Sequence, residues 1–519
     1  MFRRLFFFSM ITLLFLHVLG GKVLFGSVIN ESEKAAQTNR PLLMAHYMPW
    51  YQTPSVSGYW GWHWTMNHFN PDDVDENGQR DIASHYYPMI GPYDSQDEDV
   101  LEYQVLLMRL SGIDGVIVDW YGTEDFRDYA VLNESTEKLF SYINKAGLKF
   151  SICYEDQTIK HMVENDHLSP GEALSHGKQV MQYMEKSWLT DESYLNLDER
   201  PVLLNFGPQY FKASSNWESL FSVLETNPLF FTLDHRLQPA AAGAFPWPPM
   251  WATVDGVLSD DRLDDYLNNF YQKAHAWDII IGSAFPGFHD IYKQAGLGFS
   301  HGYLDANQGS TFESTLHTAL DHNSDIIQLV TWNDYGEGTI IEPTVEFEYR
   351  YLEMVQKIRG QIDSTFSFDK SDLRLPQRIL DLRREHENET DVNEQLDNVF
   401  QNILDNNTKS AKGILDSLSG NTPGNTGKNN TPEEYSLVWN APNPFNLSTK
   451  IYYQVPKTAH VQLSLFNCMG QHIKTLIDQH LPPGQYKTIW NAKHHTSGVY
   501  LIRLSGPDFS SYRKCLLIK

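Results

Sequence analysis

The chain has 519 residues and a formal net charge of −25, with 65 acidic residues against 40 basic ones. This length exceeds that of one ordinary domain, so two or more domains are expected. The acidic balance argues against nucleic acid as a partner, because phosphate contacts require clustered Lys and Arg. Three cysteines are too few for a disulfide framework, although Cys468 and Cys515 could pair as readily as remain two free thiols.

Residues 1–26 are typical of a secretory signal peptide. Arg3 and Arg4 form a basic start, and residues 5–19 form an apolar run that is short for a membrane span. No later stretch is long and apolar enough to cross a bilayer. We therefore expect a mature chain without a transmembrane segment, either secreted or attached to the cell surface.

Residues 38–362 alternate short apolar or β-branched runs with amphipathic helical patterns. The first clear run is PLLMAHY and the last is IIQLVTW. Residues 255–259 are a weaker candidate for a further strand. A helix is expected over residues 97–112, preceded by a Ser95…Glu98 capping box. This α/β pattern favours a (β/α)8 TIM barrel over a doubly wound sheet, because no glycine-rich phosphate loop follows the first run.

The remaining third of the chain changes character. Residues 363–434 predict a polar, partly helical linker that ends in a flexible stretch rich in Gly, Asn, Thr and Pro. Beyond it the hydrophobic period changes to two, and turn residues separate the runs. Residues 435–519 therefore predict a small all-β sandwich of the immunoglobulin-like type.

Acids and aromatic side chains recur where the expected barrel strands end. This rim carries the functional residues of a (β/α)8 barrel. Aromatic faces stack on sugars, although aromatic residues are also common in cores. The candidates in chain order are His46, Tyr47, Trp50, Asp119, Trp120, Tyr121, Tyr154, Glu155, Trp332, Asn333, Asp334, Tyr335 and Glu337.

Asp334 and Glu337 are the candidate catalytic pair. Cleavage of a glycosidic bond requires two carboxyl groups, one that protonates the leaving oxygen and one that acts as a nucleophile or base. A spacing of three residues on one loop points both side chains roughly the same way. In isolation this pattern is more often a helix N-cap. The strand-end position and the flanking Trp332 and Tyr335 favour a site.

Other chemistries fit the sequence less well. His46, His63 and His68 have no recognised metal-ligand spacing, so neither a metal nor another cofactor is expected. The acids of residues 94–99 lack the Gly and the distal Glu of a calcium loop, and the start of a helix explains them. No G-x-S-x-G, Rossmann or Walker pattern follows a strand, which argues against serine hydrolases and nucleotide-binding enzymes.

DIASHYYPMIGPYDSQDEDVLEYQ, GIDGVIVDWYG, CYEDQT and TWNDYGEGTIIEP together resemble glycoside hydrolase family 99, over roughly residues 41–360. The resemblance implies a retaining, endo-acting α-mannosidase or α-mannanase with a polysaccharide or oligosaccharide substrate. It implies that Asp334 deprotonates the sugar's own 2-hydroxyl, which forms a 1,2-anhydro sugar, and that Glu337 is the general acid/base. Glu155 would bind substrate, and the strand-end residues around it are expected to do the same.

The sequence departs from the family pattern at three places. Asp334 stands in place of Glu, which retracts the carboxylate by about 1.5 Å, and a misplacement of that size can cost about 10²-fold in rate. Tyr335 and Gly336 replace Trp and His, and Asp119 replaces a small polar residue. The alternative function is therefore a non-catalytic surface protein that binds glycans on an old hydrolase barrel.

The C-terminal runs NAPNPFN, HVQLSLFNCMGQHIKTL, LPPGQYKTIWNA and SGVYLIRL resemble the sorting domain of type IX secretion. This resemblance implies export across an outer membrane, with the type IX secretion machinery as a partner. Release or attachment at the cell surface would follow. A generic sandwich module that binds carbohydrate is the alternative interpretation of these residues.

Overall fold

The computed structural model describes residues 40–419, 436–441, 445–467, 469–506, 509–517 and 519. The signal peptide expected over residues 1–26 lies outside this part of the chain. So does Cys468, and its pairing with Cys515 therefore stays a prediction. Over the described residues, no helix combines the length and the apolar character that a membrane crossing requires.

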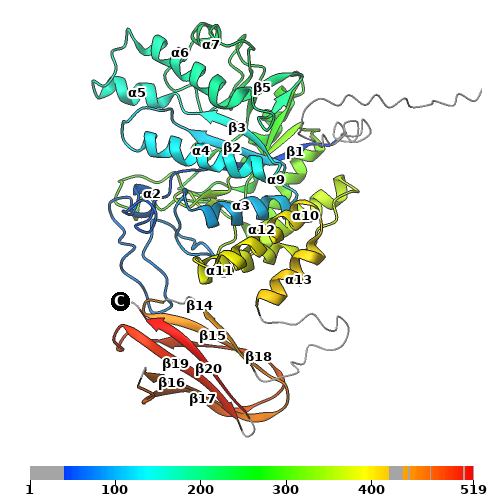
Figure 1. Cartoon of the computed structure of the whole chain (residues 1–519). Coiled ribbons are helices and arrows are strands. Elements are labelled where there is room, and N and C mark those ends of the chain that lie inside the picture. Colours follow the sequence, from blue (N-terminus) through cyan, green and yellow to red (C-terminus); the bar gives the residue numbers. More distant parts are fainter. Residues whose placement is uncertain (1–39, 420–435, 442–444, 468, 507–508, 518) are drawn as a thin grey trace, which may run out of the picture. The chain divides into compact units, whose positions relative to one another are not determined.

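Eight parallel strands form a nearly closed barrel, in the order β7-β6-β5-β3-β2-β1-β11-β8 (Figure 1). Ser283 Oγ on β8 donates to the carbonyl oxygen of Pro246, just after β7, at 2.7 Å and so links the two edge strands. The (β/α)8 prediction is confirmed. The strands are β1 (Leu42–Tyr47), β2 (Gly115–Trp120), β3 (Lys149–Tyr154), β5 (Arg200–Asn205), β6 (Leu229–Leu233), β7 (Gly243–Phe245), β8 (Ile281–Ala284) and β11 (Ile326–Leu329).

The barrel strands are buried on both faces, as parallel strands covered by helices usually are. All six residues of β2, GVIVDW, are buried. Helices follow the strands and cover the barrel. They are α3 (Glu98–Ser111), α4 (Tyr129–Lys145), α5 (Gln157–Glu164), α6 (Ala173–Met184), α7 (Ser214–Phe221), α8 (Asp260–Ala274), α9 (Ser310–Asp321) and α10 (Arg350–Ile362).

Short elements decorate the connections between these strands and helices. The strand β4 pairs antiparallel with β5, and β9 pairs antiparallel with β10. The short elements within the barrel are α2 (Trp62–Thr65), η1 (Glu185–Leu189), β4 (Asn196–Leu197), η2 (Met250–Ala252), β9 (Phe288–His289), β10 (Tyr303–Leu304) and η3 (Asn307–Gly309). A further short element, η4 (Asp372–Arg374), follows α10.

Two local predictions are wrong. The missing barrel strand is β7, whose three residues GAF carry no β-branched side chain, whereas residues 255–259 form only isolated bridges at Val257. The capping box before α3 does not form either. The N-cap is Asp97, whose carboxylate accepts the backbone N–H of Asp99 at 3.0 Å, while Ser95 Oγ accepts the N–H of Tyr51 at 3.1 Å.

The segment expected as a linker over residues 363–434 contains α11 (Leu375–Glu385), α12 (Thr390–Leu404) and α13 (Thr408–Leu418). Apolar side chains such as Leu380 and Leu396 join the barrel's hydrophobic core. Arg383 of α11 binds Glu102 of α3 through two hydrogen bonds, of 2.9 and 3.0 Å. Up to residue 418 this segment is therefore packed structure rather than a tether.

The C-terminal part is an all-β sandwich of two antiparallel sheets, as expected. One sheet has the order β14-β15-β18 and the other β17-β16-β19-β20. Both contribute to one core, which includes Ile451, Trp490 and Ile502 and is separate from the barrel core. The strands are β14 (Ser436–Ala441), β15 (Ser448–Val455), β16 (Ala459–Asn467), β17 (His472–Leu481), β18 (Gly484–Asn491), β19 (Gly498–Gly506) and β20 (Phe509–Leu517).

Candidate active site

The candidate acid pair lies on a β-hairpin beyond the end of β11. Its strands, β12 (Asn333–Asp334) and β13 (Thr339–Ile340), pair antiparallel. Gly338 adopts φ 68°, a conformation that favours glycine, and its N–H donates to the carbonyl oxygen of Asp334 at 2.9 Å. The helix-cap interpretation of the pair is wrong, because the next helix, α10, begins only at Arg350.

A cavity of about 380 Å³ opens where the barrel strands end. It draws residues from β1 and β2, from the segment just after β3, from the hairpin and from the loop after β8. This is the rim at which a (β/α)8 barrel carries its functional residues. Of the residues expected from the sequence, the cavity is lined by His46, Trp50, Asp119, Tyr121, Glu155, Asp334 and Glu337.

The surroundings of Asp334 and Glu337 differ in a way that suits acid–base chemistry. Burial raises the pKa of Asp334, and the backbone N–H of Glu337, 2.9 Å from Oδ1, opposes that rise. Burial and the charge of Asp334 raise the pKa of Glu337, while a 3.2 Å hydrogen bond from Tyr292 OH opposes them. Once Asp334 ionises, its charge holds the proton on Glu337. One carboxylate and one carboxylic acid can thus coexist.

Asp119 and Glu155 add two further carboxyl groups to the same cavity. Burial is the first cause that raises both pKa values, and each carboxyl also lies in the field of another acid of the cavity. Asp119 Oδ1 and Glu155 Oε2 are buried and have no hydrogen-bond partner in the described structure. Buried polar atoms are costly without partners. These two oxygens are therefore suited to bind the hydroxyl groups of a ligand.

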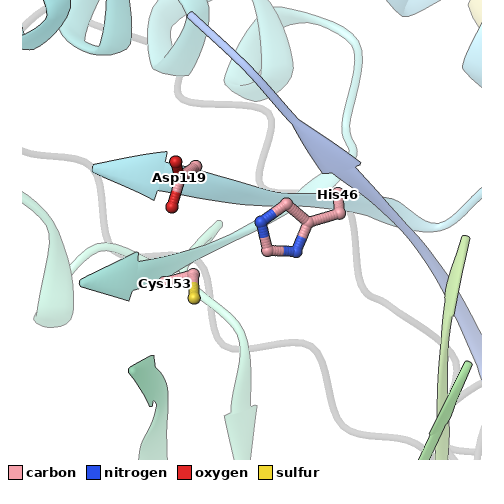
Figure 2. Close-up of side chains that lie close together, drawn as sticks. All are labelled: His46, Asp119 and Cys153. Atoms are coloured by element: carbon pink, nitrogen blue, oxygen red, sulfur yellow. The ribbon is translucent and has the colours of Figure 1, made fainter. Parts of the chain in front are cut away.

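His46 is held as a neutral imidazole at the base of the cavity. Its Nδ1 lies 2.9 Å from Gln328 Oε1, and burial lowers the pKa of the ring to about 4. Figure 2 shows the ring turned toward Asp119 and Cys153, and potential ligand atoms of the three lie within 4.8 Å of one another. These residues could hold a divalent cation, but burial raises the pKa of the Cys153 thiol and so opposes the thiolate.

Six residues expected to bind substrate lie behind the cavity wall instead of in it. Four of them bond through their polar groups within the protein: Tyr47 OH donates to Gln104, Trp120 Nε1 to Asn133 and Tyr335 OH to Glu342. Asn333 exchanges two hydrogen bonds with the backbone of Met48. Tyr154 OH and Trp332 Nε1 are buried and have no hydrogen-bond partner in the described structure. Alternation along each strand turns every second side chain away from the cavity. The residues to which this correction applies are Tyr47, Trp120, Tyr154, Trp332, Asn333 and Tyr335.

Other lining residues were not foreseen as substrate binders. The loop after β8 brings Tyr292, Phe299 and His301 into the cavity, and the segment after β7 brings Trp247. The loop after β8 has no periodic pattern, and β7 was missed, so neither segment gave a signal. Trp62 and His63, from the aromatic-rich stretch after β1, also line the cavity.

Comparison with known proteins matches both parts of the chain. The model of glycosyl hydrolase family 99 matches residues 39–168, and that of the secretion system C-terminal sorting domain matches residues 441–519. A glycoprotein endo-alpha-1,2-mannosidase of Mus musculus is 25% identical over 360 residues, covering 61% of this chain and 73% of that protein.

Two further proteins are similar. A glycoprotein endo-alpha-1,2-mannosidase-like protein of Danio rerio is 24% identical over 326 residues, covering 58% of this chain and 70% of that protein. A solved structure, the GH99 endo-alpha-mannosidase from Bacteroides thetaiotaomicron, is 20% identical with a TM-score of 0.46, covering 62% of this chain and 97% of that one.

The class of protein defined by this barrel and its acid-lined cavity is the glycoside hydrolases. Within that class the chain is a family 99-like barrel followed by a type IX secretion sorting domain. The sorting domain indicates a secreted or cell-surface location.

Proposed function

We propose that the chain is an exported, retaining glycoside hydrolase that cleaves within α-linked glycans, with α-mannan-like chains as the first candidates. The observation that carries the proposal is the hairpin acid pair, Asp334 and Glu337, which line one cavity. Burial raises the pKa of both carboxyl groups, and the charge of Asp334 raises that of Glu337 further. The relatives are endo-alpha-mannosidases by name, which supports α-linked mannose as the sugar.

The first chemical step uses the two acids together. Asp334, as the carboxylate, takes the proton of the sugar's 2-hydroxyl, and that oxygen attacks the anomeric carbon to form a 1,2-anhydro sugar. Glu337, as the carboxylic acid, donates its proton to the leaving oxygen as the glycosidic bond breaks. The 3.2 Å hydrogen bond from Tyr292 holds the Glu337 carboxyl in position for this transfer.

The second step reverses the proton transfers. Glu337, now a carboxylate, takes a proton from water, which attacks the anomeric carbon and opens the anhydro ring. The 2-oxygen recovers its proton from Asp334. Two displacements at one carbon restore the original anomeric configuration, so the enzyme retains stereochemistry.

The other lining residues bind the sugar in this proposal. Asp119 and Glu155 accept hydrogen bonds from hydroxyl groups through their unpartnered oxygens. Trp50 and Tyr121 supply aromatic faces, and Trp50 is held by a stack on His63 at a centroid distance of 4.1 Å.

A panel of α-linked glycans incubated with the full chain tests the proposal. We expect oligosaccharide products from an α-mannan, and NMR of the fresh product should show the α-anomer first. Binding of a glycan with no product over long incubation would instead support the alternative, a non-catalytic glycan-binding protein on a hydrolase barrel. The shorter side chain of Asp334 is the feature that favours that alternative.

A further inference from the structure

Three potential metal ligands from neighbouring barrel strands meet beside the acid-lined cavity. His46 is on β1, Asp119 on β2 and Cys153 on β3, and the last two are paired across the sheet. All three side chains are buried, and their ligand atoms lie within 4.8 Å of one another (Figure 2). The spacing along the sequence gave no sign of this group, because each ligand comes from a different strand.

The hydrogen bonding of His46 is that of a metal-binding histidine. An amide oxygen only accepts hydrogen bonds, so Gln328 Oε1, 2.9 Å from Nδ1, fixes the ring proton on Nδ1. Nε2 then carries the lone pair, and it is buried with no hydrogen-bond partner among the described residues. A ligating histidine usually donates its other ring N–H to an outer partner in this way, which fixes its tautomer and orientation.

Asp119 presents a second buried acceptor to the same place. Its Oδ1 also lacks a hydrogen-bond partner within the part of the chain that the structure describes. Buried acceptors without donors carry a desolvation cost. A cation bound between His46 Nε2 and Asp119 Oδ1 satisfies both atoms at once.

The combination of one nitrogen, one oxygen and one sulfur ligand suits zinc. The ligand atoms of a tetrahedral Zn²⁺ site, with bonds of about 2.0–2.3 Å, stand about 3.5 Å apart, so modest side-chain rotations close this group around the ion. Burial raises the pKa of the free Cys153 thiol and keeps it protonated. A bound cation reverses this effect: the S–H bond breaks, the sulfur bonds the metal, and the proton leaves to water.

A metal ion can reach the group through the cavity, because His46 and Asp119 both line it. The four carboxyl groups of that cavity attract cations. Three protein ligands leave the fourth tetrahedral position to water, as in zinc sites that remain open. In the proposed function Asp119 Oδ1 accepts a sugar hydroxyl, so a metal and a sugar compete for this oxygen.

We propose that His46, Asp119 and Cys153 form a binding site for a thiophilic divalent cation of the zinc class, and that the bound ion inhibits hydrolysis by occupying Asp119. The binding site does not depend on the proposed function. The inhibition rests on it, because it requires Asp119 to contact the substrate.

Cobalt binding to the full chain tests the site, because Co²⁺ replaces Zn²⁺ in such sites and its bond to a thiolate gives a charge-transfer absorption in the near ultraviolet. We expect this band to saturate at one ion per chain. The double variant Cys468→Ala/Cys515→Ala is the matched control and should keep the band, since Cys153 is then the only cysteine in the chain. Cys153→Ala should lose the band while its circular dichroism stays unchanged.

Zinc affinity, measured by displacement of the cobalt, provides a second readout. Asp119→Asn should weaken zinc binding about tenfold or more, because it removes the charged ligand. Gln328→Leu should weaken it about 10–100-fold, because it frees the ring of His46. Zn²⁺ should slow hydrolysis by the unsubstituted chain and a chelator should restore it. Cys153→Ala should hydrolyse at the normal rate and resist Zn²⁺, because Cys153 does not line the cavity.

A cobalt–thiolate band that persists in Cys153→Ala, or its absence from the double variant that retains Cys153, would overturn the site. Zinc affinity unchanged in both Asp119→Asn and Gln328→Leu would overturn it as well. Zinc that binds without slowing hydrolysis would overturn the inhibition alone. Failure of the proposed function would appear separately, as absence of hydrolysis by the metal-free chain.

Discussion

At the scale of single residues, the site depends on the different hydrogen bonds and charges around two similar acids. Asp334 receives a backbone N–H, and its pKa is raised chiefly by burial. Glu337 experiences burial and also the charge of Asp334, and the hydroxyl of Tyr292 is its main compensation. Activity should fall at low pH as Asp334 gains a proton, and at high pH as Glu337 loses its own. Both limits should lie above the usual range of carboxyl groups.

Tyr292→Phe should move the alkaline limit of kcat/KM upward by roughly half a pH unit. The lost hydrogen bond stabilised the Glu337 carboxylate, so without it the pKa of Glu337 rises and the acid stays protonated to higher pH. The check is a pH–rate profile. Tyr142→Phe is the matched control, because Tyr142 also donates to a carboxylate, Glu98 at 3.3 Å, but lies outside the cavity. A limit that moves downward would contradict this assignment.

At the scale of elements, the hairpin β12–β13 is supported by the buried carboxyl group of Glu342, which follows β13. Glu342, whose pKa burial raises to about 7, accepts hydrogen bonds from Tyr93 OH at 2.8 Å and Tyr335 OH at 3.0 Å. Gln104 Nε2 donates to its other oxygen at 2.7 Å. The acids and aromatics of TWNDYGEGTIIEP thus divide into two groups, one facing the cavity and one that supports it.

Tyr335→Phe should lower the free energy of unfolding by about 1 kcal/mol, because Glu342 loses one hydrogen-bond donor. It should leave KM unchanged, because Tyr335 does not line the cavity. Denaturant unfolding and steady-state kinetics measure the two quantities. Tyr121→Ala, which removes an aromatic face from the cavity wall, provides the contrast and should raise KM. A several-fold increase of KM in Tyr335→Phe, with stability unchanged, would restore Tyr335 as a substrate contact.

At the scale of the whole molecule, the barrel could be predicted because its long strands are continuous apolar runs, such as GVIVDW. The three-residue strand β7 and the loop that carries Tyr292 have no such signal, so their contribution to the cavity was invisible. Strand-end position identified Asp119, Glu155, Asp334 and Glu337 as acids of one rim. It could not separate cavity-facing side chains from supporting ones, since that depends on register and on the hairpin.

The segment after residue 362 was likewise hard to predict, because the sequence does not show which surfaces its helices pack against. A polar surface made residues 363–434 look like a linker. The amphipathic faces of α11, α12 and α13, however, pack on α3 and on one another, and they enter the barrel core. The sandwich has its own core, with Trp490 and Ile502 among its members. Export and catalysis can therefore be assigned to two parts of the chain, each with its own hydrophobic core.

The most direct measurement compares two substrates with Glu337→Gln and Asp334→Asn: an α-mannose oligosaccharide and an aryl α-mannobioside with a good leaving group. Glu337→Gln should lose about 10²–10⁴-fold on the oligosaccharide yet keep most of the initial release from the aryl substrate, which needs no protonation. Asp334→Asn should lose both, because each requires the 2-hydroxyl to be deprotonated. Full activity of Glu337→Gln on the oligosaccharide would contradict the assignment of the acid pair.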